Sequence, residues 1–270
     1  MNRSGAFSSN VIECQGPMAQ FCTALVAVQV SPQPGLDLTI IPHDSVVLSI
    51  QFAQGREPFS RSTDRGLLPE LCTYRDLPLT YRPIGGCLSF LGLLTPRGAM
   101  ALTAGQPLPC PDGPRRPLAQ LLERSRLIEL EDRMARSPDV HQQLEAFGAW
   151  IEDAVSTRTA LPLQANRAAR MASAIFSKPA LTLQQVAALE GVRQRQMERD
   201  FNGWLAISPK QASLLARVQG AARLGVRGGA LADVAHSLGF VDQSHMNKAV
   251  KRITGVSPRV LISSAQTEMS

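Results

Sequence analysis

The pattern of apolar and polar positions along the chain changes near residue 118. Before that point, short apolar runs such as FCTALVAVQV (21–30) alternate with segments rich in proline and glycine, which is typical of strands and turns. The run LTIIPHDSVVLSIQF (38–52) contains two apolar segments interrupted by Pro-His-Asp-Ser, which predicts a hairpin or a strand pair. The region before the loop CPDGPRRP (110–117) is therefore expected to be strand-rich.

A helical period follows that loop. Apolar residues recur at helical spacing in LAQLLERSRLIELEDRM (118–134), and Leu144, Phe147 and Ile151 form the stripe of a second helix over 138–156. TRTALP (157–162) is the predicted linker. The predicted fold class is α+β: a strand-rich domain with two closing helices over 1–159, then an all-α domain over 160–270.

A short helical pattern occurs twice in the second half. LQQVAALEGV (183–192) and LADVAHSLGF (231–240) align at an offset of 48 residues, each with a small alanine for close packing and a glycine at the helix end. A second helix follows in each copy, and both copies close with Ser-Pro. Helix, glycine turn and helix at this length predict two helix-turn-helix units, over 182–209 and 230–258, joined by a helix over 209–225.

The two units differ in their predicted caps. Thr182 followed by Gln185 matches a capping box, whereas Ala230 stands at the equivalent position of the second unit and supplies no cap. Asp242 is predicted to cap the second helix of that unit.

The second helix of each unit has a polar face, in RQRQMERDF (193–201) and DQSHMNKAVKR (242–252). Such side chains contact base edges in the major groove and phosphates beside it. The predicted base-reading residues are Arg195, Glu198, Arg199, Gln243, Ser244, His245 and Lys248. The predicted phosphate contacts are Thr182, Arg193, Lys251 and Arg252. Glu198 has two interpretations, acceptance of a hydrogen bond from cytosine or an intrahelical pair with Arg195 or Arg199, and the pair is favoured.

Charge supports a nucleic-acid partner. The chain has 270 residues, a pI of about 9.4 and a net charge of +6. Residues 160–270 hold 14 basic and 6 acidic side chains, whereas residues 1–159 hold 14 and 16. Ordinary helical hairpins with solvated faces remain an alternative, but two tandem copies on the basic part of the chain disfavour it.

Other chemistry finds little support. The five cysteines are odd in number and form no CxxC pair, so neither a zinc site nor a disulfide framework is predicted. His43 and His141 are the only histidines of the first half, too few for a metal cupin, and no paired catalytic carboxylates occur. The chain is expected to be no enzyme and to use no cofactor or metal. The run 21–30 is too short to span a bilayer, so a cytoplasmic protein without a membrane partner is expected.

The second half resembles the AraC/XylS family of bacterial transcription regulators. The resemblance covers residues 165–262 and is carried by LADVAHSLGFVDQSHMNKAVKRITGVSPRVL (231–261), with LTLQQVAALEGVRQRQMERDF (181–201) as a weaker first copy. It implies that both second helices enter the major groove of double-stranded DNA. The chain departs from the family pattern at Ala206, where glycine is usual, at Val250, where an aromatic residue is usual, and at Lys248, which replaces a common arginine.

The first half is similar, more weakly, to the cupin-like sensor or dimerisation domains of that family, through IPHDSVVLSIQF (41–52) and FLGLLTPRGAMAL (90–102). The resemblance implies a small-molecule effector or a homodimer, and RNA polymerase as a partner if the regulator is an activator. Arg97 is the first residue to test as an effector contact. Two alternatives stay open: a cysteine-dependent DNA-repair alkyl acceptor that uses Cys72 or Cys87, and a helical protein–protein module.

Overall fold

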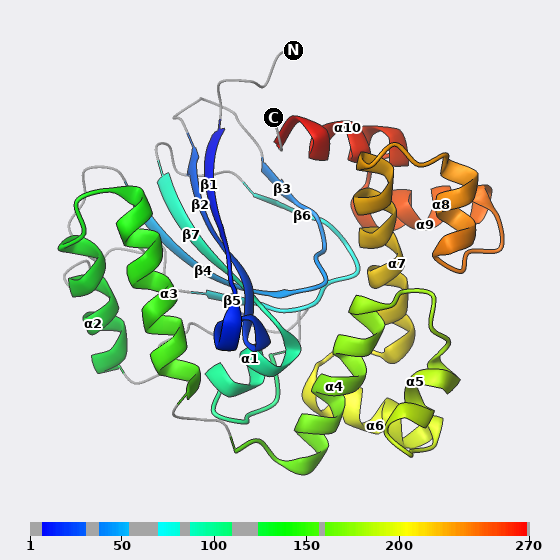
Figure 1. Ribbon diagram of the computed structural model, residues 1–270, viewed down its shortest axis with the longest axis horizontal. Coiled ribbons are helices and arrows are strands. Elements are labelled where there is room, and N and C mark those ends of the chain that lie inside the picture. Colours follow the sequence, from blue (N-terminus) through cyan, green and yellow to red (C-terminus); the bar gives the residue numbers. More distant parts are fainter. Residues whose placement is uncertain are drawn as a thin grey trace. The chain divides into compact units, whose positions relative to one another are not determined.

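The computed structural model describes residues 7–30, 38–53, 70–81, 87–109, 124–156 and 160–268. The chain forms two compact units (Figure 1). The first contains Met1–Leu38, Ser45–Thr73 and Tyr81–Asn166, and the second contains Thr39–Asp44, Tyr74–Thr80 and Arg167–Ser270.

An antiparallel sheet forms the core of the first unit. Its strand order is β1 (Phe7–Glu13), β2 (Cys22–Val30), β7 (Cys87–Leu94), β4 (Val46–Ala53) and β5 (Glu70–Cys72). A 3-10 helix, η1 (Gly16–Gln20), joins β1 to β2, and α1 (Pro96–Leu102) follows β7. The buried residues of β2 include Leu25, Ala27 and Val30, so one face of the strand contributes to the core.

Two helices, α2 (Arg124–Ala135) and α3 (Val140–Ser156), complete this unit, and α3 packs on the sheet (Figure 1). The predicted stripe of Leu144, Phe147 and Ile151 is fully buried. Close approach is built into the contact, because a Cβ on Gly148 would lie 2.5 Å from Leu25 Cδ1. Of the first predicted helix, residues 118–123 lie outside the described part of the chain, as do 157–159 of the predicted linker.

The predicted hairpin over 38–52 was wrong. Its first segment, β3 (Leu38–Ile40), pairs with β6 (Leu79–Tyr81) in a separate two-stranded sheet, whereas β4 pairs with β5 and β7. Pro42 lies between the two segments and has no backbone N–H for a strand ladder. Each segment therefore finds its partner far away in the sequence.

The second unit is helical, apart from its short extended segments. Its helices are α4 (Leu163–Ser177), α5 (Leu183–Leu189), α6 (Gln194–Trp204), α7 (Pro209–Val226), α8 (Leu231–Ser237), α9 (Gln243–Thr254) and α10 (Pro258–Glu268). The predicted α+β class is confirmed: an antiparallel sheet region with helices precedes a helical region. None of the described helices is long and apolar enough to cross a membrane.

Candidate nucleic-acid interface

The first helix-turn-helix unit consists of α5 and α6. Thr182 and Gln185 form the predicted capping box, in which the Thr182 hydroxyl accepts from the Gln185 amide and the Gln185 side chain accepts from the Thr182 amide. Gly191 ends α5 with a φ of 62°, in the left-handed region that favours glycine. The Val192 amide donates to the Ala187 carbonyl at 3.0 Å and closes the turn before α6.

The second helix-turn-helix unit consists of α8 and α9, and it repeats this turn. Gly239 has a φ of 73°, and the Phe240 amide donates to the Ala235 carbonyl at 3.0 Å. As predicted, Ala230 supplies no side-chain cap, and Asp242 Oδ1 accepts from the His245 amide at 2.7 Å. The sequence repeat is thus also a repeat of turn geometry.

Apolar anchors hold each second helix against the first. Met197 and Phe201 of α6 are fully buried, and so are Met246 and Val250 of α9. The resemblance in sequence led us to expect an aromatic residue at position 250, and the smaller Val250 is fully buried there. Phe240 in the turn is also buried, and its ring meets that of His245 edge-on at 5.5 Å.

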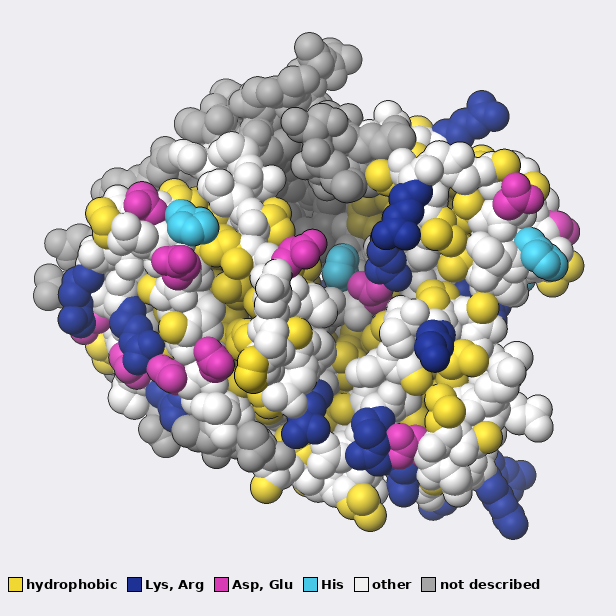
Figure 2. Space-filling view, in the orientation of Figure 1, with side chains coloured by type: hydrophobic (Ala, Val, Ile, Leu, Met, Phe, Trp, Pro, Cys, Tyr) yellow, Lys and Arg dark blue, Asp and Glu magenta, His cyan; other side chains and the backbone are white. Residues whose placement is uncertain are grey.

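The structure places the predicted base-reading residues on the opposite faces of these helices. Arg195 and Arg199 of α6 are exposed, and Glu198 between them is half-buried. On α9, four predicted residues are exposed: Gln243, Ser244, His245 and Lys248. Of the predicted phosphate contacts, Thr182, Arg193, Lys251 and Arg252 are all exposed, although the Thr182 hydroxyl is engaged in its cap. Figure 2 shows Lys and Arg side chains projecting from the visible surface of this unit.

The favoured partner of Glu198 was wrong. Its Oε1 accepts from Gln194 Nε2 at 3.2 Å, one turn earlier on α6, rather than from an arginine. Arg199 instead donates from Nη2 to Gln196 Oε1 at 2.7 Å. Each of these two charged side chains therefore pairs with a neutral glutamine amide, which donates to Glu198 in one case and accepts from Arg199 in the other.

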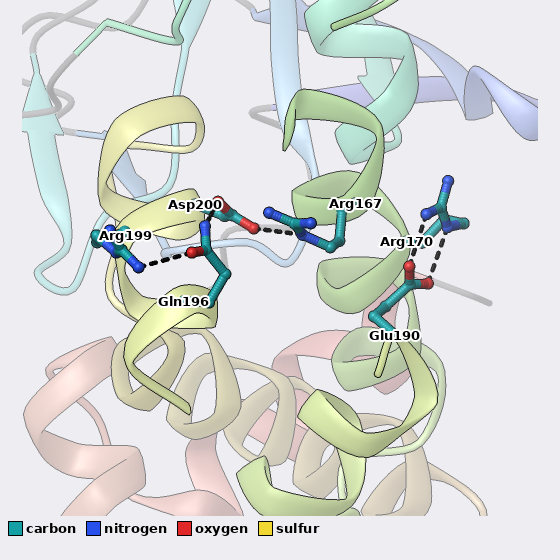
Figure 3. A network of polar contacts seen from close by, with 6 residues as sticks. All are labelled: Arg167, Arg170, Glu190, Gln196, Arg199 and Asp200. Atoms are coloured by element: carbon teal, nitrogen blue, oxygen red, sulfur yellow. Dashed lines mark hydrogen bonds and ion pairs between the residues drawn. The ribbon is translucent and has the colours of Figure 1, made fainter. Parts of the chain in front are cut away.

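Two ion pairs connect α4 to the first helix-turn-helix unit, α5 and α6 (Figure 3). Arg167 Nε donates to Asp200 Oδ2 at 2.6 Å, and this hydrogen bond raises the pKa of Arg167. Arg170 binds Glu190 through two hydrogen bonds of 2.8 and 2.6 Å. The sequence analysis missed Asp200, although a carboxylate beside Phe201 on the apolar side of α6 is a signal for a buried ion pair.

Helix α7 contacts both helix-turn-helix units, since it packs against α5 and α6 of the first and against α8 and α9 of the second. Arg217 of α7 donates to the Gly239 carbonyl at 3.1 Å and to the Pro179 carbonyl at 3.3 Å. Its guanidinium also lies 5.9 Å from the Phe240 ring centroid, and burial lowers the pKa of Arg217. A Cβ on Gly220 would lie 2.6 Å from Leu238 Cδ2, so α7 approaches the end of α8 closely. Helix α7 thus contacts both helices of each helix-turn-helix unit.

A family model described as a helix-turn-helix domain matches residues 186–263. Among solved structures, an AraC-type transcriptional regulator from Chromobacterium violaceum is 20% identical over 37% of this chain and 91% of its own, with a TM-score of 0.34. A DNA-binding transcriptional dual regulator from Escherichia coli K-12 is 24% identical over 40% and 99%, with a TM-score of 0.34. ToxT from Vibrio cholerae O395 is 11% identical over 95% and 97%, with a TM-score of 0.42. No curated protein matches the chain.

The matched residues include both turns, both second helices and the helix between them. Residues 186–263 therefore form a DNA-binding domain of the tandem helix-turn-helix class. Two such units in tandem lie within the matched residues, 186–263.

Proposed function

We propose that the chain is a sequence-specific regulator that reads two successive major-groove segments, one with α6 and one with α9. The observation that carries this proposal is that the same turn geometry occurs twice, in two helix-turn-helix units that both pack against α7. Both second helices follow a left-handed glycine, expose a polar face and contact α7 directly. One chain therefore carries two reading surfaces, where a single helix-turn-helix protein needs a dimer to cover two half-sites.

The chemistry of the two faces differs. The α6 face offers Arg195 and Arg199, which suit guanine, and Glu198, which suits the amino group of cytosine. The α9 face offers Gln243, which suits adenine, together with Ser244, His245 and Lys248. Lys251 and Arg252 lie in the last turn of α9 and suit phosphates, which contribute affinity that depends on salt.

For the first unit we propose a role in effector sensing or in dimerisation, in the cytoplasm and without a catalytic step. The support is the resemblance of the sequence to the AraC/XylS family, the match of residues 186–263 to a helix-turn-helix domain, and the presence of a separate compact unit built on its own sheet. An effector regulates DNA binding only if it binds one conformation of the protein better than another. The alkyl-acceptor alternative gains no support from the comparisons.

Selection of bound sequences from a random pool of duplexes, with the full-length protein at physiological salt, tests the proposal. We expect a motif of two blocks whose centres lie about 10 base pairs apart, one helical turn of DNA. Binding that shows no sequence preference would refute the sequence-specific function. Mass measurement in solution, with and without DNA, tests the homodimer separately.

A further inference from the structure

A chain of four polar side chains runs from α4 to the surface of α6 (Figure 3). It begins with the Arg167–Asp200 ion pair. Gln196 Nε2 donates to the second carboxylate oxygen, Asp200 Oδ1, at 2.7 Å. Gln196 Oε1 then accepts from Arg199 Nη2 at 2.7 Å. The exposed Arg199 is thereby linked to a buried ion pair.

The hydrogen bonds among these four side chains can run in only one direction. A carboxylate only accepts hydrogen bonds and a guanidinium only donates them, so the amide between Asp200 and Arg199 must present its nitrogen to the first and its oxygen to the second. The reverse orientation would place two donors together at Arg199 and two acceptors together at Asp200. The Gln196 amide is therefore fixed by the charges on both sides.

The inner end of the chain is well anchored. Asp200 is 3% exposed and the Arg167 side chain 17% exposed, and each oxygen of the carboxylate has its own donor. A buried charge with both sides satisfied resists displacement, because any movement would leave it without a partner. Asp200 thus gives Gln196 a fixed point from which to hold the arginine.

The outer end keeps free donors. A guanidinium has five N–H donors and Gln196 takes one of them, so Arg199 retains enough to bind O6 and N7 of guanine in the two-bond mode. An arginine already ordered before binding also loses less conformational entropy when it meets DNA. Within the described residues, Arg195 on the same helix shows no comparable hydrogen bond.

We propose that Gln196, held by the buried Asp200–Arg167 pair, is a positioning residue that orients the Arg199 guanidinium for a guanine in the major groove. The inference rests on the proposed function of α6. It predicts that Gln196 affects DNA recognition only through Arg199.

A double-mutant cycle tests this prediction. The full-length wild type, Gln196→Met, Arg199→Ala and the double variant are titrated with a duplex that carries the motif selected by the wild type. We expect Arg199→Ala to weaken binding by about 5-fold to 150-fold and Gln196→Met by about 3-fold to 10-fold. When Arg199 is already alanine, Gln196→Met should change the dissociation constant by less than about 2-fold.

Two further readouts separate positioning from a general structural role. Gln196→Met should relax the preference at the one base position that Arg199→Ala also relaxes, and it should leave the salt dependence of binding unchanged because no phosphate contact is lost. Gln194→Met is the matched control, since this amide lies on the same helix but donates to Glu198. Its effect should be the same with and without Arg199.

Equal effects of Gln196→Met in both backgrounds would overturn the inference while leaving the proposed function intact. A wild type that selects no motif would overturn both. A Gln196→Met variant that loses binding to all duplexes and unfolds at a lower temperature would show a structural role, and would also overturn the inference.

Discussion

The backbone at Ala206 predicts a stabilising substitution. Ala206 follows the C-cap of α6, Leu205, and has a φ of 53°. The left-handed conformation costs a non-glycine residue about 1–2 kcal/mol. Ala206→Gly removes that strain but gives the unfolded chain more freedom, which costs about 0.4–1 kcal/mol. We therefore expect the free energy of unfolding to rise by about 0.5–1 kcal/mol.

Gly255 supplies the matched control. It stands at the equivalent position after α9, with a φ of 77°, and a Cβ there would lie 3.7 Å from Pro78 Cγ, an ordinary contact. Gly255→Ala should therefore introduce backbone strain without a clash and lower the free energy of unfolding by about 1 kcal/mol. The two substitutions should act in opposite directions.

Urea unfolding measures both effects. The chain has two tryptophans, Trp150 in α3 and Trp204 in α6, so a Trp150→Phe background leaves Trp204 fluorescence as the reporter of the first helix-turn-helix unit. A gain of 0.5–1 kcal/mol corresponds to a midpoint about 0.3–0.7 M higher for a typical slope. Gly255→Ala is followed by far-ultraviolet circular dichroism. A lower midpoint for Ala206→Gly, or shifts of both variants in the same direction, would refute the reasoning from backbone strain.

Three further predictions concern caps, phosphates and pH. Thr182→Ala should lower the free energy of unfolding by about 1 kcal/mol, because the capping box is lost. Ala230→Thr should raise it by a similar amount, because it adds a cap to the second helix-turn-helix unit. Urea midpoints of both variants check this, and shifts in the same direction would contradict it. Lys251→Ala should weaken binding to all duplexes alike and reduce the slope of log affinity against log salt by about 1, and a change of base preference would argue against a phosphate contact. Burial lowers the pKa of His43 from its ordinary 6.5, so the unfolded chain binds a proton first and the free energy of unfolding falls as the pH drops below about 6.5. His43→Asn should lose less stability than the wild type between about pH 7.5 and 5.5, and an equal loss would refute this role.

Local signals in the sequence predicted the helix-turn-helix units well. The capping box at Thr182, the cap at Asp242 and the left-handed glycines at 191 and 239 each depend on residues within one turn of helix. Spacing of apolar residues likewise predicted which side of α6 and α9 faces the core, because a helix has a fixed period. These features need no knowledge of distant parts of the chain.

Contacts between distant residues could not be predicted in the same way. Asp200 pairs with Arg167, 33 residues earlier, and nothing in the spacing identifies which of several arginines faces it. Arg199 donates to the neutral amide of Gln196, because Asp200 of the buried ion pair already orients that amide. The partner of Arg199 therefore depends on the long-range Arg167–Asp200 contact. The strand pairing of 38–52 failed for a related reason, because β4 gains an eight-residue ladder with β7 that a local hairpin cannot match.

The central claim is that α6 and α9 read separate segments of one site. Its most direct test repeats the selection from random duplexes with Arg199→Ala and with Gln243→Ala, one substitution in each second helix. We predict that each variant loses preference in a different block of the wild-type motif, with the two blocks about 10 base pairs apart. Loss of preference in the same block by both variants, or a wild-type motif with one block only, would contradict the claim.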